Sequence, residues 1–335
     1  MVCSKCGTTN PDDTEYCMRC AAPLRPAEKP SLEIIAERMV SQYDRAGTDK
    51  RVSPWWILIL FLTIVPSAVL GIGYVVLNLY MAIMDSHYSL DFGDWSQRLY
   101  GYGLPLFEML FGILAAILVS RLIGRLNTHL EREGRLTRDL VAYVRTSATP
   151  EQLPKISDEL LVASSHAGLP WTFEKTMDAK KWGLWIAVLY VLGGFMMLVA
   201  YELPWMFFER GDLFDYIAAL SLWSKASGIV SALTTVVLLV IAIHLMRTLS
   251  VHQLRWREFI RSVYDLMGMI GKKSPSQDLP KKPRERSVVL YALLTLVTFG
   301  LFGFYWLYAL IDDPNKHFEE HVATEETLFA GIRGW

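Results

Sequence analysis

The chain of 335 residues is 52% hydrophobic and only 20% charged, and its mean hydropathy is +0.27. This composition separates it from ordinary soluble proteins and places it among integral membrane proteins. The formal net charge of −1 says little by itself, whereas the distribution of the charges along the chain is informative.

All four cysteines lie near the N-terminus as two CxxC pairs, Cys3 with Cys6 and Cys17 with Cys20. Two pairs at this separation can surround one ion tetrahedrally, which predicts a structural Zn²⁺ site. Gly7 follows the second ligand, where the backbone must curl round the sulfurs. Because zinc thiolates persist in reducing compartments, we expect a cytoplasmic N-terminus. The alternative is a disulfide-bonded secreted mini-domain, which no signal peptide supports.

Residues 1–24 resemble the zinc-ribbon family. The resemblance rests on Cys-Gly at 6–7, Asn-Pro at 10–11 and Tyr-Cys at 16–17, while Ala21 stands where these ribbons usually carry a second glycine. A segment this short cannot fold without its metal, so metal binding and folding are one event. Acidic residues outnumber basic ones between the cysteines, so we expect the ribbon to dock proteins and not nucleic acid.

Five apolar stretches each reach the roughly 20 residues that a bilayer crossing needs. They cover residues 55–84, 101–120, 182–201, 222–246 and 288–311. Lysine and arginine alternate between the flanking segments, with 8, 1, 10, 1, 10 and 2 residues in turn. By the positive-inside rule, this pattern predicts five crossings of the plasma (cytoplasmic) membrane with the N-terminus inside. We expect the basic inner face to lie against anionic lipid headgroups.

The last stretch is interrupted by Gly300 and Gly303. Its sequence Thr298-Phe-Gly-Leu-Phe-Gly-Phe-Tyr-Trp-Leu-Tyr308 resembles the recurring core of the membrane family catalogued as domain of unknown function (DUF) 4234, and the resemblance covers about residues 284–330. That family has no assigned activity, so the resemblance implies none. We expect 288–311 to cross the membrane fully; the alternative is a re-entrant hairpin that dips in and returns.

The membrane part has a repeated layout. Each of two units holds an amphipathic helix, a Trp-led span, an acidic loop, a second span and a further helix outside the membrane. We therefore expect an all-α integral membrane protein with about five transmembrane helices, its two hairpins related by an axis along the membrane normal. The predicted segments are the ribbon at 1–24, a linker with an amphipathic helix at 25–53, a first transmembrane hairpin at 54–148, a second at 149–271, a basic linker at 272–286 and the last span with its tail at 287–335.

The helices expected outside the membrane, at 31–45, 126–145 and 249–270, carry apolar residues at steps of three and four. In 249–270 these residues include Trp256 and Phe259. We expect the three helices to pack on one another as a small cytoplasmic domain. The alternative places the basic helix in the lipid headgroup layer.

Glu108 is the one carboxylate well inside a predicted span, and Lys225 lies at a similar depth in the fourth. Ionisable groups in a membrane are costly unless they are paired or functional. We expect the two residues to form an intramembrane ion pair, and a role for Glu108 in a permeation path is the alternative.

Three histidines, His129, His252 and His317, each follow a predicted span by a few residues. Their neighbours share no ligand spacing, so the sequence does not predict a metal or proton site there. His317 and His321 are four residues apart, but they form no HExxH motif.

The sequence contains no nucleotide-binding loop and no nucleophile or acid–base motif. It therefore offers no catalytic residues, and we expect a non-enzymatic scaffold or sensor, anchored in the membrane, whose ribbon docks protein partners. The alternative is a component of a small-solute or ion transport or channel system that uses Glu108.

Overall fold

The computed structural model describes residues 2–3, 6–9, 32–41, 48–83, 92–168, 177–209, 213–272, 279–281, 286–298 and 300–333. Within these ranges the only β structure is an isolated bridge between Val2 and Thr9, so the predicted all-α fold class is confirmed. The helices are α1 (Leu32–Ser41), α2 (Trp55–Ile83), α3 (Phe92–Ser147), α4 (Leu153–Gly168), α5 (Ala179–Glu209), α6 (Leu213–Met269), α7 (Val288–Val297) and α8 (Leu301–Arg333).

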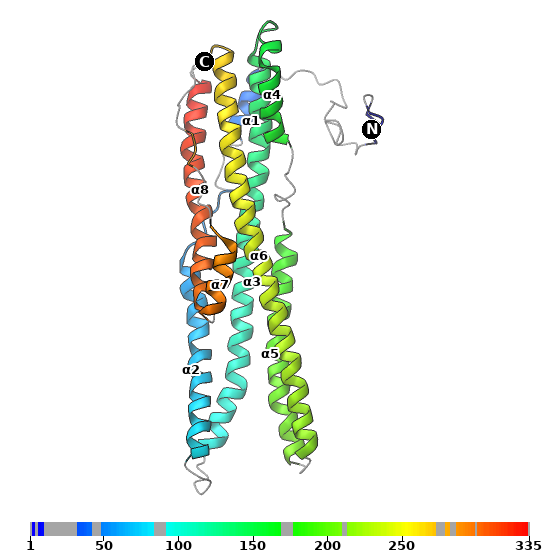
Figure 1. Ribbon diagram of the computed structural model, residues 1–335, viewed down its shortest axis with the longest axis vertical. Helices are drawn as coiled ribbons and strands as arrows, with labels where there is room; N and C mark the ends of the chain where they lie inside the picture. The colour runs from blue at the N-terminus through cyan, green and yellow to red at the C-terminus, as the bar shows by residue number, and fades with distance from the viewer. Residues whose placement is uncertain are drawn as a thin grey trace.

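Two helical hairpins form an elongated bundle (Figure 1). α2 packs on α3 in the first hairpin, α5 packs on α6 in the second, and α3 packs on α5 between them. A short helix, a helix of 29 or 31 residues and a helix of 56 or 57 residues occur twice in succession, as α1–α2–α3 and α4–α5–α6. The repeated layout read from the sequence is therefore present in the structure.

The long helices α3 and α6 run unbroken from the membrane part into the bundle beyond it. The sequence predicts a separate helix after each of these spans, at 126–145 and 249–270, and this boundary is wrong. In α3, buried leucines continue at helical spacing from Leu118 through Leu126 to Leu140, so one packed face persists beyond the apolar stretch and past Gly134.

Among the described residues, three helices are long and apolar enough to cross a membrane, within Gly101–Ser147, Ala179–Glu202 and Ser221–Met269. α2 is a further helix of 29 residues whose first part, Trp55–Pro66, is apolar. Large apolar side chains such as Leu184 point outward from these helices, as a lipid-facing surface requires. The chain is an α-helical membrane protein.

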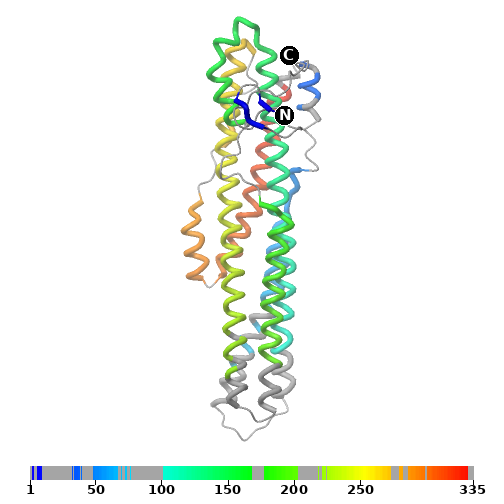
Figure 2. Tube along the Cα trace, turned by 90° about the vertical axis from the view of Figure 1, so that its right-hand side faces the viewer, coloured from blue at the N-terminus to red at the C-terminus, as the bar shows by residue number. Residues whose placement is uncertain are grey.

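The stretch 288–311 does not form the single spanning helix that the sequence predicts. α7 has 10 residues and spans roughly 15 Å, about half of a bilayer's hydrocarbon core. The chain then turns at Gly300, whose φ of 91° suits glycine, and α8 runs back along α7 (Figures 1 and 2). Arg286, just before α7, pairs with Asp313 in α8 at 2.6 Å, so both ends of this hairpin lie at the same level. The hairpin therefore has the backbone path that the re-entrant alternative requires.

The extramembrane bundle consists of α1, α4 and the parts of α3, α6 and α8 beyond residues 120, 246 and 311 (Figure 1). Its core joins Met39 of α1, Leu140 of α3, Trp256 and Phe259 of α6, and Leu328 of α8. The apolar faces predicted for these helices therefore pack on one another, and the face of α6 that carries Trp256 is buried in protein.

Candidate functional site

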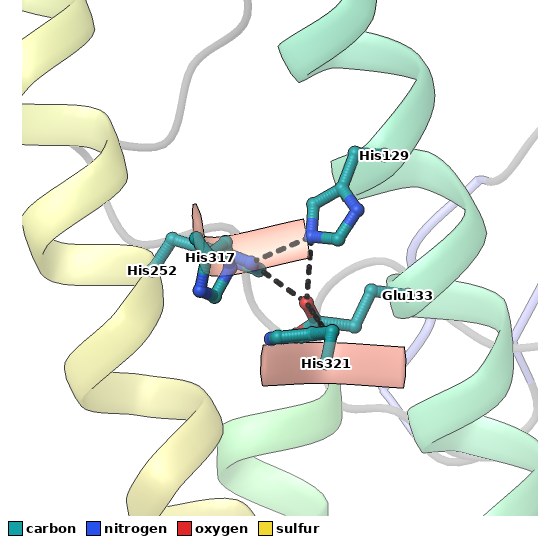
Figure 3. Close-up of side chains that lie close together, drawn as sticks. All are labelled: His129, Glu133, His252, His317 and His321. Atoms are coloured by element: carbon teal, nitrogen blue, oxygen red, sulfur yellow. Dashed lines mark hydrogen bonds and ion pairs between the residues drawn. The ribbon is translucent and has the colours of Figure 1, made fainter. Parts of the chain in front are cut away.

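A cluster of polar side chains is buried where the two hairpins meet α8. It contains His129 and Glu133 of α3, His252 of α6, and His317 and His321 of α8, and we call it the histidine centre (Figure 3). The five residues are at most 4% exposed. One potential ligand atom from each lies within 4.8 Å of the others. Side chains from three separate helices thus converge on one small volume.

The closest approaches involve Glu133 and the two histidines of the hairpins. His252 Nε2 lies 2.7 Å from Glu133 Oε2, and His129 Nε2 lies 3.5 Å from the same oxygen. The Nε2 atoms of His129 and His252 are 3.2 Å apart. His321 Nδ1 is 3.8 Å from Glu133 Oε2, so this carboxylate occupies the middle of the centre (Figure 3).

Helix periodicity accounts for the way each element presents its residues. His129 and Glu133 are four residues apart on α3, and His317, His321 and Glu325 follow one another at steps of four on α8, so each set lies on one helix face. His129 and His252 stand 18 and 17 residues before the last residues of α3 and α6, which are equivalent positions in the repeat. The repeat therefore supplies one histidine from each hairpin.

A second layer of charged groups surrounds the centre. Asp49 Oδ1 accepts a hydrogen bond from His129 Nδ1 at 2.9 Å, which leaves the Nε2 of His129 directed at the centre. Arg132 bridges Asp49 and Glu325, each at 3.0 Å. Arg255 Nη2 lies 3.5 Å from Glu133 Oε1. These contacts fix the ring of His129 and tie α3 to α8.

Burial holds the two histidines of α8 in the neutral form. It lowers the pKa of His317 well below its ordinary value, and it lowers the pKa of His321 although Glu325 and Glu133 act against it. For Glu325, burial opposes ionisation, yet His321 and Arg132 lower its pKa to about 2. The centre therefore combines the neutral imidazoles of α8, which have a free lone pair, with the ionised carboxylate of Glu325. Burial also acts to lower the pKa of His129, but Asp49 and Glu133 outweigh it and raise that pKa.

Several of these buried atoms lack a hydrogen bond within the described part of the chain. They include the Nε2 of His317, the Nδ1 of His252 and both ring nitrogens of His321. Buried polar atoms are normally satisfied, and a group of unsatisfied atoms at one place is typical of a ligand-binding site. A cavity of about 180 Å³ between α6 and α8 is lined by both histidines of α8 and by Trp256.

The sequence shows these histidines one by one, but it does not predict that they meet. Two signals could have found the centre, the His317–His321 pair at a step of four and the matching positions of His129 and His252 in the repeat. A fifth crossing would have placed His317 on the opposite side of the membrane from the other two. The re-entrant hairpin returns α8 to the same side and brings them together.

The first half of the zinc ribbon has the expected backbone. Gly7 N donates to Cys3 O at 2.9 Å, Cys3 N donates to Thr8 O at 2.9 Å, and Gly7 has a φ of 71°. These bonds fold the chain round Cys3 and Cys6 as a metal-binding knuckle requires. Cys17 and Cys20 lie outside the described residues, so the four-cysteine site remains a prediction.

The predicted ion pair between Glu108 and Lys225 is not formed among the described residues. Glu108 faces a cavity of about 40 Å³ between α3, α5 and α6, lined by Tyr190, Ser231 and Thr234. Lys225 is exposed and lies six residues before Ser231, roughly 9 Å along α6. The sequence predicts a similar depth for Glu108 and Lys225, but Lys225 lies at a different level along α6 and on an exposed face of it.

Comparison with protein families assigns the two ends of the chain. Residues 2–24 match the zinc-ribbon domain, and residues 286–332 match the domain of unknown function DUF4234. Both resemblances read from the sequence are confirmed, and the ribbon match suggests zinc binding. No curated protein and no solved structure matches the chain. The DUF4234 match covers the α7–α8 hairpin and so includes two of the four histidines of the centre.

Proposed function

We propose that this protein is a membrane-anchored, non-enzymatic sensor that detects its signal at the histidine centre and uses the zinc ribbon to dock protein partners. The observation that carries the proposal is the position of the centre, at the junction of both membrane hairpins with the α7–α8 hairpin. An occupant of the centre would contact all three parts at once. A change in occupancy would therefore change how they are held together.

Hydrogen bonds also hold the middle of α8 against the rest of the protein. Arg125 donates to Asn315 Oδ1 at 2.6 Å and to the backbone oxygens of Leu310 and Ile311. Asn315 in turn donates to Val52 O at 2.9 Å. Hydrogen bonds between protein groups replace bonds to water and contribute only about 1 kcal/mol each. These bonds add to the apolar contacts that Ile311 and Leu328 of α8 make.

Because the histidine centre contains unsatisfied atoms, the packing of α8 depends on a ligand bound there. Each buried polar atom without a partner costs about 1–3 kcal/mol. An occupant that satisfies several of them stabilises the closed packing of α8 and leaves the open form unaffected. Binding would then favour the closed state and release would favour an open one, which is the property a sensor needs.

The charge pattern supports the proposed orientation. The segments rich in lysine and arginine flank the ends of α2, α3, α5 and α6 that lead to the extramembrane bundle. The positive-inside rule would place this bundle and the ribbon in the cytoplasm, with the basic linker 272–286 against anionic lipid of the plasma membrane. Proteins that the ribbon docks would then be cytoplasmic.

A transport role receives less support. The cavity beside Glu108 has room for only a few water molecules, which does not amount to a path. Accordingly, we assign Glu108 no role in the proposed function.

The test measures whether α8 opens. In a chain with all four cysteines replaced by serine, Leu328→Cys places a thiol in the core beneath α8, and Ala323→Cys places one on its exposed face. After dialysis in detergent to remove small ligands, we expect a maleimide to label position 328 faster, and a low-molecular-weight cell fraction should restore its protection. Position 323 should label equally throughout. Constant protection of position 328 under both conditions would contradict the sensor.

A further inference from the structure

We propose that the histidine centre binds one divalent transition-metal ion, separate from the zinc of the ribbon. The ligands are His129, Glu133, His252, His317 and His321. This inference deepens the proposed function and rests on it only for the role of the site, since it names the ligand of the sensor. The metal site itself is argued from geometry and chemistry.

The spacing of the potential ligand atoms matches a coordination sphere. Metal–nitrogen and metal–oxygen bonds of about 2.0–2.2 Å place neighbouring ligands about 3.0–3.5 Å apart and opposite ligands about 4.2 Å apart. The separations of 3.2 Å between His129 and His252 and 3.5 Å between His129 and Glu133 lie in this range, whereas the 2.7 Å between His252 and Glu133 is shorter and has to widen when an ion binds. All five ligand atoms fall within 4.8 Å of one another, so one ion can reach them with small side-chain shifts.

The donor set selects a class of metal. Four imidazoles and one carboxylate suit first-row divalent ions such as Zn²⁺, Co²⁺, Ni²⁺, Fe²⁺ and Mn²⁺. Ca²⁺ and Mg²⁺ prefer all-oxygen sites, which this centre does not provide. The centre also lacks the thiolates that favour Cu⁺. Five potential ligands exceed the four of a closed structural zinc site, so ions with five or six ligands fit as well.

The charged groups around the centre match those that support known kinds of metal site. Metal-binding histidines commonly donate their second ring N–H to a carboxylate, and Asp49 accepts from His129 in this way. The ion-paired network holds three carboxylates, Asp49, Glu133 and Glu325, and two guanidiniums, Arg132 and Arg255.

A packed core without an ion explains the arrangement less well. Four buried histidines in one core should pair their nitrogens with each other or with carbonyl groups. Instead, the Nε2 of His317 and both ring nitrogens of His321 have no hydrogen-bond partner among the described residues. These two rings also line the cavity of about 180 Å³ between α6 and α8, which gives an ion a way to reach them.

The experiment uses the full-length chain with its four cysteines replaced by serine, so that the ribbon binds no metal. After purification, removal of metal with a chelator and equilibration with Zn²⁺ or Co²⁺, elemental analysis should find one ion per chain. The Co²⁺ form should show the weak visible bands of nitrogen and oxygen ligation without thiolate charge transfer. Metal addition should also raise the melting temperature.

Variants locate the ion. His252→Ala and His317→Ala, from different helices, should each weaken Zn²⁺ affinity at least 100-fold, and Asp49→Asn, outside the ligand set, should weaken it about 10- to 100-fold. His166→Ala of α4 is the matched control and should bind normally. Metal-free circular dichroism must show the same helix content in all variants. If the parent chain binds no ion, or if His252→Ala and His317→Ala bind as tightly as the control, the metal site is wrong.

The two proposals can fail separately. Binding of one Zn²⁺ without any change in the labelling of Leu328→Cys would support the metal site and contradict the proposed sensor function. If the labelling of Leu328→Cys responds to the cell fraction but not to any of the five metal ions, the sensor function is supported and the metal site is contradicted.

Discussion

Arg286 and Asp313 form a bidentate ion pair that closes the open end of the α7–α8 hairpin, with Nε–Oδ2 and Nη2–Oδ1 distances of 2.6 and 2.7 Å. Arg286 also donates to the hydroxyl of Tyr291 in α7. The pair joins residues 27 positions apart in the sequence, one before the apolar stretch and one after it. A chain that crossed the membrane between them could not form this contact.

The first prediction is therefore that α8 lies on the same side of the membrane as the basic linker 272–286. In the cysteine-free chain, Thr327→Cys should be protected from an impermeant maleimide in intact cells, like Ser276→Cys in the basic linker. Ser89→Cys, in the acidic loop between α2 and α3, should be labelled. Labelling of position 327 from outside would show that residues 288–311 cross the membrane.

The Arg286–Asp313 pair should stabilise the hairpin. Its side chains are partly buried, and loss of either partner should cost about 1–2 kcal/mol, between the values for exposed and buried pairs. Thermal unfolding in detergent would measure the loss for Arg286→Ala and Asp313→Ala. The exchanged pair, Arg286→Asp with Asp313→Arg, should recover part of it. Lys281→Ala, which removes an exposed partner of Glu320, is the control and should change little.

The ribbon should bind one Zn²⁺ through Cys3, Cys6, Cys17 and Cys20, with Zn–S distances of about 2.3 Å by X-ray absorption. The Cys17→Ser variant should lose this ion and still insert its helices, because the membrane helices do not depend on the ribbon. Measurements should be made with His252→Ala present, so that an ion at the histidine centre is not counted. A thiolate-bound ion that persists in Cys17→Ser would refute the assignment.

Glu108 and Lys225 should act independently. Since no ion pair joins them, Lys225→Met should change the free energy of unfolding by less than about 0.5 kcal/mol. The double-mutant cycle with Glu108→Gln should give a coupling energy within about 0.5 kcal/mol of zero. Thermal or denaturant unfolding in detergent provides the four values. A coupling energy above about 1 kcal/mol would show that the two residues interact, as the sequence predicts.

The sequence by itself determined the features that depend on neighbouring residues. Apolar runs long enough to cross a bilayer identify the helices of the two membrane hairpins, although the same criterion misassigned 288–311. Steps of three and four give the buried faces that carry Trp256 and Phe259. The spacing of the cysteines identifies the ribbon, and the Thr298–Tyr308 segment identifies the DUF4234 hairpin. Each of these signals lies within one helix or one short segment.

Only the tertiary structure decided where the histidines meet. His129 and His252 are 123 residues apart, and His317 lies on a helix whose direction depends on the turn at Gly300. A helical period shows which residues share a face, but it does not show which faces of separate helices come together. The same limit applies to Glu108 and Lys225, where similar depth along two spans did not bring the side chains into contact. Packing of the hairpins and the return of α8 set these distances, because both depend on contacts between residues far apart in the chain.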